Sequence, residues 1–184
     1  MIKNFSFKLS IFFLIVSCSQ PIVQKDNRGY HAKIGDSVGN INFTLTDGST
    51  ISLNQLKGKV IVLQFTASWC SVCRKEMPFL EEEVWMKYKD DDFILIGVDY
   101  DEPLEKVIAF KQKMKITYPM AIDPDGKIFM KFSYKGSGVT RNVIIGKDGK
   151  IAYLTRLFDR EEFDEMKKEI SDLLNSDTNN STLR

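Results

Sequence analysis

The sequence offers few metal-binding side chains, because its 184 residues include only three cysteines and one histidine, His31. A zinc site needs four ligands, or three and a water molecule, so a zinc centre is disfavoured and we expect no bound metal or other cofactor. His31 lies in a polar stretch, and we assign it no function. Basic runs are also absent and the formal net charge is +1, so nothing in the charge pattern fits a nucleic-acid backbone.

Long apolar segments are missing as well. The N-terminal apolar run covers residues 9–16, which is too short to span a bilayer as a permanent helix. Lys3 and Lys8 precede this run, and basic residues before a short apolar run are typical of a signal peptide. We therefore expect residues 1–17 to be a signal peptide that takes no part in the fold.

A cysteine in a short motif follows the apolar run. Residues 15–18 read Ile-Val-Ser-Cys, which resembles a bacterial lipobox, in which the cysteine becomes the lipidated first residue of the mature chain. The resemblance implies that Cys18 anchors the protein to a membrane. The alternative is an ordinary signal peptide that leaves Cys18 as a free thiol. Lipidation of Cys18 would leave the other two cysteines as a pair.

The rest of the chain is expected to form one domain between two polar segments. Hydrophobic residues make up 43% and charged residues 28%, an ordinary balance for one globular core. We expect residues 18–33 to be the lipidated cysteine and a flexible tether, because this stretch is polar and shows no periodicity. Residues 34–175 should form the domain, and residues 176–184 a disordered tail.

Hydrophobic patterns in the domain alternate between strand and helix. Short, β-branched runs predict central parallel strands, and turn signals predict two hairpins. The expected elements are a hairpin around Asp47-Gly48, a helical turn at 53–56, a strand at 60–65, a helix from Cys70 to about Tyr88 kinked at Pro78, a strand at 93–98, a helix over 104–110, a short strand at 118–122, a short helix at 128–132, a hairpin around Asp148-Gly149 and a helix from Asp159. This order predicts an α/β fold with a mixed central sheet, helices on both faces and an N-terminal β-hairpin extension.

Two cysteines stand two residues apart where the first central strand gives way to a helix. Cys70 is expected at the first turn of that helix, where unpaired N–H groups and the helix dipole favour a thiolate. Such a thiolate attacks disulfides, and Cys73, one turn later, can resolve the mixed disulfide. The alternatives are a structural disulfide, half of a zinc site or two buried core cysteines. A loop this short gains little as a structural staple, so redox chemistry is favoured.

The motif W-C-x-x-C-x-x-E-x-P, from Trp69 to Pro78, resembles the signature of thioredoxin-like thiol–disulfide oxidoreductases of the membrane-tethered TlpA/ResA/CcmG type. The resemblance covers roughly residues 34–175 and implies a thioredoxin fold. It also implies that Cys70 and Cys73 form a redox-active disulfide that exchanges with protein substrates, more as a reductase than as an oxidase. The implied setting is the bacterial cell envelope, facing the periplasm, with a lipid anchor and a membrane electron donor or acceptor. We expect a monomer.

Of two polar residues expected to line the site, Gln64 and Glu76, only Glu76 is a candidate for proton transfer. Gln64 lies six residues before Cys70, where minimal thioredoxins carry a buried aspartate, and a glutamine side chain cannot ionise. Glu76 follows Cys73 by one helical turn, so the two side chains can be neighbours. In the resembling proteins this glutamate couples to the titration of the sulfurs. The alternative for Glu76 is a surface carboxylate without contacts.

Two further residues of the motif, Arg74 and Trp69, have less specific roles. Arg74 is a cation that could lie near the Cys70 thiolate and lower its pKa, or could simply point into water. Trp69 directly precedes the first cysteine and is expected to line the site.

No proline occurs after Pro124, which is a departure from the resembling proteins. They carry a cis-proline facing the two cysteines, whereas this chain has Thr140 at that position, followed by Arg141. A cis bond before a residue other than proline costs about 2.5–4 kcal/mol, so we predict a trans bond between Val139 and Thr140. Arg141 is expected to add a charge beside the site.

Two other functions use the same residues. A peroxiredoxin-like thiol peroxidase would oxidise Cys70 to a sulfenic acid that Cys73 resolves, but peroxidases on related folds carry a different motif. A copper-binding carrier would use thiolates, which suit cuprous copper. Copper carriers on this fold resemble CxxxC with a distant histidine downstream, whereas this chain has CxxC and no histidine after it.

Overall fold

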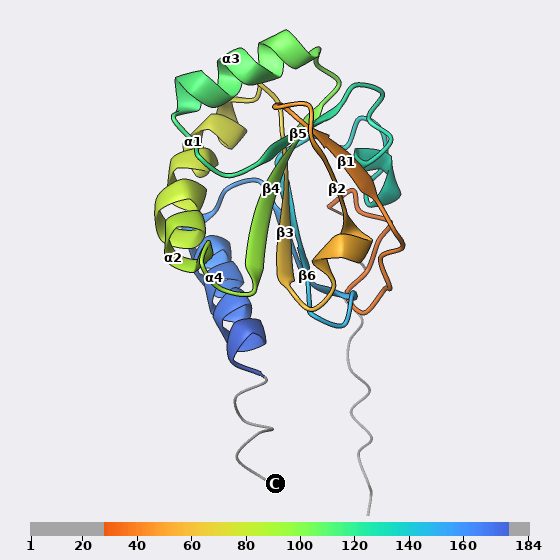
Figure 1. The fold of residues 1–184 in the computed structure, drawn as a ribbon, viewed down its shortest axis with the longest axis vertical. Helices are drawn as coiled ribbons and strands as arrows, with labels where there is room; N and C mark the ends of the chain where they lie inside the picture. The colour runs from red at the N-terminus through yellow and green to blue at the C-terminus, as the bar shows by residue number, and fades with distance from the viewer. Residues whose placement is uncertain (1–27, 177–184) are drawn as a thin grey trace, which may run out of the picture.

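The computed structural model describes residues 28–176 (Figure 1). The expected signal peptide, Cys18 and the expected tail after residue 176 lie outside the described residues. Within the described part of the chain, no helix is long and apolar enough to cross a membrane.

A seven-stranded mixed sheet forms the centre of the domain, in the order β2-β1-β5-β4-β3-β6-β7. Strands β3, β4 and β5 run parallel to one another, and the outer pairs are antiparallel. The strands are β1 (Asn42–Leu45), β2 (Thr50–Ser52), β3 (Val60–Thr66), β4 (Phe93–Tyr100), β5 (Met120–Asp123), β6 (Arg141–Ile145) and β7 (Ile151–Arg156). Both predicted hairpins are confirmed, and β3 is buried along its whole length, as its continuous apolar run predicts.

The predicted N-terminal hairpin extends the sheet. Strand β1 pairs with β2 on one side and with β5 on the other, both antiparallel. The hairpin therefore forms the edge of the sheet beyond β5. The two parallel strand pairs of the sheet, β3 with β4 and β4 with β5, lie further inside it.

Helical segments cover both faces of the sheet, but unequally (Figure 1). One face carries α1 (Ser71–Phe79), α3 (Leu104–Met114) and α4 (Arg160–Asn175), whose apolar side chains share one core cluster. The other face is covered by two short 3₁₀ turns, η1 (Leu53–Leu56) and η3 (Phe129–Lys131), which belong to a second cluster. The prediction of helices on both faces holds, with every long helix on the same side.

The helix after the cysteines runs to Tyr88, as predicted, but changes its geometry on the way. α1 passes into the π-helical segment η2 (Leu80–Trp85) and then into α2 (Met86–Tyr88). Pro78 lies just before this change and cannot donate a backbone hydrogen bond, so it breaks the regular α-helical ladder. The sequence predicted a kink at this place and not a π-helical turn.

The beginning of α4 is fixed by its cap. The Asp159 carboxylate accepts the backbone N–H groups of Glu161 and Glu162, at 3.0 and 3.1 Å, which satisfies two of the donors left free at a helix start. The helix thus starts where the sequence predicted.

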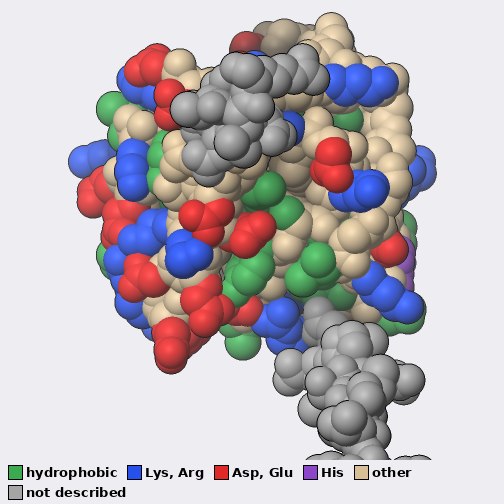
Figure 2. All heavy atoms as spheres, turned by 90° about the horizontal axis from the view of Figure 1, so that it is seen from below, with side chains coloured by type: hydrophobic (Ala, Val, Ile, Leu, Met, Phe, Trp, Pro, Cys, Tyr) green, Lys and Arg blue, Asp and Glu red, His purple; other side chains and the backbone are tan. Residues whose placement is uncertain are grey.

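Charged side chains of both signs are interspersed on the face seen from below in Figure 2. Ion pairs also join α4 to η2: the Arg160 guanidinium donates to both Glu83 oxygens, at 2.7 and 2.8 Å, and Lys167 pairs with the same carboxylate. Exposed pairs of this kind contribute modestly to stability.

The residues before β1 pack more closely than the tether prediction allows. The Tyr30 side chain is 4% exposed, and its backbone forms an isolated bridge with Ser133. The Tyr30 hydroxyl donates to the backbone oxygens of Asn142 and Thr155, at 3.2 and 2.8 Å. The predicted tether over residues 18–33 was therefore too long at its C-terminal end, because the packed domain includes Tyr30.

Candidate active site

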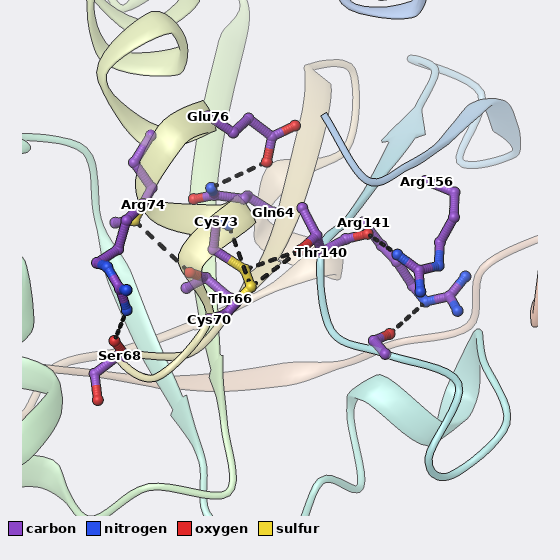
Figure 3. Close-up of a disulfide and its surroundings, with 12 residues drawn as sticks. Gln64, Thr66, Ser68, Cys70, Cys73, Arg74, Glu76, Thr140, Arg141 and Arg156 are labelled. Carbon is purple, nitrogen blue, oxygen red and sulfur yellow. Dashed lines mark hydrogen bonds between the residues drawn. A yellow bond between two sulfur atoms is a disulfide. The ribbon is translucent and has the colours of Figure 1, made fainter. Parts of the chain in front are cut away.

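The two cysteines lie where β3 passes into α1, and they form a disulfide (Figure 3). Cys70 is the N-cap of α1, and its Sγ accepts the backbone N–H of Cys73 at 3.2 Å. Cys70 is 8% exposed and Cys73 is fully buried. A sulfur at a helix N-terminus that accepts an N–H is favoured as a thiolate once the disulfide is reduced.

The turn before Cys70 is held by charged side chains on both sides. The backbone N–H and the hydroxyl of Ser68 donate to the Glu102 carboxylate, at 2.5 and 2.7 Å. The Arg74 guanidinium donates to the Ser68 carbonyl at 2.6 Å. The sequence left two alternatives for Arg74, a place near the Cys70 thiolate or an orientation into water, and in the structure its guanidinium instead points to the Ser68 carbonyl (Figure 3). It orients the chain that enters the active site.

Thr140 faces both sulfurs from the opposite side. Its Oγ1 lies 3.1 Å from Cys70 Sγ and 3.2 Å from Cys73 Sγ, and the side chain is buried. The described residues contain no cis peptide bond, which confirms the predicted trans bond before Thr140. A hydroxyl at this distance can donate a hydrogen bond to a thiolate, and such a bond favours the charged form.

Trp69 directly precedes Cys70 and lies at the protein surface. Its side chain is 59% exposed, although indole rings are mostly buried in folded proteins. The sequence placed Trp69 at the site from its position alone, and the structure leaves its ring available to a partner.

Glu76 is buried beneath the disulfide turn, so the surface alternative for this residue was wrong. Its carboxylate accepts from Asn142 Nδ2 at 2.6 Å and, more weakly, from Gln64 Nε2 at 3.4 Å. The Tyr118 hydroxyl donates to Gln64 Oε1 at 2.8 Å, which orients the Gln64 amide towards Glu76. Burial raises the pKa of Glu76 to about 7, against the opposing effect of the hydrogen bonds from Asn142 and Gln64. A carboxyl group with this pKa can take up and release a proton near neutral pH.

Arg141 does not present a charge beside the disulfide, which corrects the sequence-based expectation. Its side chain is fully buried, and its guanidinium lies over the Tyr30 ring, with Cζ 4.4 Å from the ring centroid. Figure 3 shows Arg141 on the far side of Thr140 from the sulfurs. A buried arginine in this position acts on the loop that carries Thr140.

Sequence reasoning missed two polar groups in the interior. Asn142, the strongest partner of Glu76, lies on β6 directly opposite Gln64 on β3. Asp99 lies on β4, fully buried, opposite Thr66. Each lies at one end of an apolar run, Asn142 directly before the run of β6 and Asp99 directly after the run of β4, and a polar residue bordering a buried run is the sequence signal that could have identified them.

Asp99 lacks the hydrogen bonds that Glu76 has. Among residues 28–176, neither of its carboxylate oxygens finds a hydrogen-bond partner. Burial, reinforced by the neighbouring Glu102 carboxylate, raises the pKa of Asp99 to about 8. Burial also opposes the ionisation of Glu102, but hydrogen bonds from Lys106 and Ser68 outweigh it and hold the pKa of Glu102 below its usual value. At neutral pH the negative charge of this pair therefore lies on Glu102, and Asp99 keeps its proton.

A metal site is not assembled in the region that the structure describes, where no three His, Cys, Asp or Glu side chains are grouped to hold an ion. The two sulfurs have Thr140 as their polar neighbour, and the chemistry of the site is that of a dithiol and disulfide.

Known proteins are similar to this chain in sequence and in architecture. Residues 33–173 match the Redoxin family. A thiol–disulfide oxidoreductase ResA from one strain of Bacillus cereus is 38% identical over 112 residues, which cover 60% of this chain and 63% of that protein. The ResA of a second B. cereus strain is 34% identical over 129 residues, covering 67% of this chain and 73% of the relative. The match thus spans less than two thirds of the first relative and somewhat more of the second.

The architecture also agrees with a solved structure. A protein from Bacteroides thetaiotaomicron, described as a candidate protein disulfide isomerase and solved in solution, is 51% identical, with a TM-score of 0.78 over 80% of this chain and 93% of that one. This likeness confirms the predicted thioredoxin fold. The Redoxin match covers most of the sequence, and the second ResA relative is covered over more than two thirds of its length. The chain therefore belongs to the Redoxin family, among the thioredoxin-like thiol–disulfide oxidoreductases of TlpA/ResA/CcmG type.

Proposed function

We propose that this protein exchanges disulfides with protein substrates, with Cys70 as the attacking sulfur and Cys73 as the resolving one. The observation that carries the proposal is the difference between the two sulfurs: Cys70 caps α1 and is partly exposed, whereas Cys73 is buried one turn further on. The Cys70 thiolate attacks a substrate disulfide and forms a mixed disulfide, releasing one substrate thiolate. Cys73, once deprotonated, attacks Cys70 Sγ, releases the second substrate thiolate and closes the Cys70–Cys73 disulfide.

Glu76 can accept the proton that Cys73 loses during this reaction. Cys73 must lose its proton before it attacks the mixed disulfide. Glu76 lies one helical turn after Cys73 on the same helix, and its pKa of about 7 suits a group that accepts a proton near neutral pH.

Trapping experiments test the roles of the two cysteines. Cys73→Ser removes the resolving sulfur, so mixed disulfides between Cys70 and substrates should accumulate in cells and appear as reducible bands on non-reducing gels. Cys70→Ser is the matched control, because it retains one thiol, but the buried one. If Cys70→Ser accumulates substrates and Cys73→Ser does not, the assigned roles are reversed.

The direction and the cellular setting belong to the same proposal. We infer a monomeric reductase in the bacterial cell envelope, facing the periplasm, fed by a membrane electron donor and anchored through lipidated Cys18. The support is the resemblance of residues 15–18 to a lipobox and the names of the ResA relatives.

Two measurements separate this setting from others. A reduction potential of the Cys70–Cys73 pair near that of thioredoxin, roughly −270 mV, supports a reductase, whereas one near that of DsbA, roughly −120 mV, supports an oxidase. Cys18→Ala should release the protein from the membrane fraction or block its processing. Membrane association that survives this substitution would exclude the lipid anchor.

A further inference from the structure

The loop that carries Thr140 is held from behind by two arginines (Figure 3). Arg141 donates from Nε to the Gly138 carbonyl at 3.0 Å and from Nη2 to the Ser137 carbonyl at 2.8 Å. Arg156, on β7, donates to the same Ser137 carbonyl at 2.9 Å and reaches the Thr140 carbonyl at 3.4 Å. Three carbonyls of one short loop are thus bound by two cations on the side away from the disulfide.

The N-terminal segment closes over one of these arginines. The Arg141 guanidinium lies between the loop and the Tyr30 ring, 4.4 Å from the ring centroid, and the Tyr30 hydroxyl is fixed by two backbone carbonyls. Space beside Gly29 is minimal: a Cβ added there would lie 2.8 Å from Arg141 Nη2 and 2.5 Å from Ser137 Cβ. Gly29 also adopts φ +88°, which favours glycine.

We propose that the Gly29–Tyr30 segment and Arg141 together position Thr140 over the two sulfurs. The segment holds Arg141 in place, Arg141 holds the Ser137 and Gly138 carbonyls, and the loop then keeps Thr140 Oγ1 within 3.2 Å of both sulfurs. After reduction, the Thr140 hydroxyl donates to the Cys70 thiolate and lowers its pKa. Arg141 is therefore a positioning residue. This inference rests on the proposed role of Cys70 as the attacking thiolate.

A pair of glycine substitutions tests whether the Gly29–Tyr30 segment positions Thr140. Gly29→Ala places a methyl group against Arg141 and Ser137, whereas Gly35→Ala is the matched control, because Gly35 has nearly the same φ of +90° and open space within 4 Å of its Cβ. Both variants carry nearly the same backbone strain, but only Gly29→Ala crowds Arg141 and Ser137. The readout is the rate of Cys70 alkylation by iodoacetamide against pH, in the full reduced chain.

We expect Gly29→Ala to slow alkylation at pH 6 at least threefold and to shift the whole profile to higher pH, with Gly35→Ala matching the unsubstituted protein. The shift should disappear in a Thr140→Val background, because the hydroxyl through which the segment acts is then absent. Equal profiles for Gly29→Ala and Gly35→Ala would overturn the proposal. So would a Gly29→Ala shift that persists without the Thr140 hydroxyl.

A second pair keeps the test decisive if Gly29→Ala does not fold. Tyr30→Leu removes the ring beneath Arg141, and Tyr30→Phe keeps the ring but removes the hydroxyl. The alkylation profile should move to higher pH in Tyr30→Leu and much less in Tyr30→Phe, and identical profiles for the two would exclude a role for the ring. Iodoacetamide reads the thiol itself, so this result is independent of the substrate-trapping test, whose failure would instead count against protein disulfide exchange.

Discussion

Glu76 and Asp99 are two carboxyl groups buried in the same domain, and their surroundings differ sharply. Glu76 accepts hydrogen bonds from Asn142 and Gln64. Asp99 has no hydrogen-bond partner in the described part of the chain and faces the Glu102 carboxylate instead. Hydrogen bonds to the charged form hold the pKa of Glu76 near neutrality despite complete burial, whereas at Asp99 the Lys106 charge only weakly opposes the effects of burial and of the Glu102 carboxylate. Burial beside a second carboxylate produces an acid that stays neutral at pH 7, whereas burial with hydrogen-bond donors produces an acid that titrates near pH 7.

Both acids link stability to pH in the same direction. Their folded-state pKa values lie above the usual ones, about 7 against 4.5 for Glu76 and about 8 against 3.8 for Asp99. The folded state therefore binds protons more tightly than the unfolded state between these values, and the free energy of unfolding falls as the pH rises. The fall should extend from about pH 4 to about pH 8 and level off above it.

The largest effect is expected from Asp99→Asn. An amide cannot ionise, so the part of the fall in stability that comes from Asp99 should vanish, and at pH 9 the variant should exceed the unsubstituted protein by on the order of 5 kcal/mol. Below about pH 4, where Asp99 is protonated in both the folded and the unfolded state, the two should be similar. Urea unfolding at both pH values measures this difference.

Asp101→Asn is the matched control for Asp99→Asn. Asp101 is exposed two residues further on and adopts φ 57°, a conformation that asparagine tolerates well. This variant should follow the pH dependence of the unsubstituted protein. If Asp99→Asn follows it too, Asp99 does not retain its proton in the folded state.

Glu76→Gln should have a smaller effect on stability and a larger one on the thiol. The shift of the Glu76 pKa from 4.5 to about 7 is worth about 3 kcal/mol, but the new amide places an N–H₂ group against the amides of Asn142 and Gln64. The loss of a buried hydrogen bond offsets about 1–3 kcal/mol of that gain. Removing a negative charge near Cys70 should also lower the apparent thiol pKa by about one unit, which alkylation against pH measures.

The comparison of the two acids predicts a difference in this second readout. Asp99→Asn should leave the Cys70 titration in place, because Asp99 is protonated at neutral pH and lies on β4. Equal shifts in Cys70 for the two variants would remove the distinction between them. An unmoved profile in Glu76→Gln would leave Glu76 with a purely structural role.

Much of the fold followed from local patterns, because strand and helix periodicities depend on neighbouring residues alone. The hairpins, the start of α4 and the strand–CxxC–helix unit are local features of this kind. The trans bond before Thr140 followed from the cost of the cis form. The motif likewise placed Glu76 near the sulfurs, although its burial was left open.

The partners of these residues could not be predicted, since they come from pairings between distant segments. Asn142 meets Glu76 only because β6 pairs with β3 in a register that sets Asn142 opposite Gln64. Arg141 turns towards Tyr30 because a segment interpreted as tether packs against it. Such contacts depend on the register of the sheet and on the path of the N-terminal chain, which local composition does not encode.

The smallest predicted effect concerns Tyr118, which acts on Glu76 through one intermediate. Its hydroxyl orients Gln64, and Gln64 supports the Glu76 anion with a long hydrogen bond of 3.4 Å. Tyr118→Phe should cost about 1 kcal/mol of stability and weaken this support, so that Glu76 holds its proton more tightly. With less negative charge beside it, the Cys70 thiol pKa should fall by about 0.3 units, in the same direction as in Glu76→Gln and by less.

Tyr153→Phe is the control, because the Tyr153 hydroxyl donates to Glu165 on an exposed part of the molecule and should leave the thiol pKa unchanged. In a Glu76→Gln background Tyr118→Phe should no longer move the thiol, since the acid through which it acts is gone. A thiol shift that survives in that background would mean that Tyr118 reaches the sulfurs by another route.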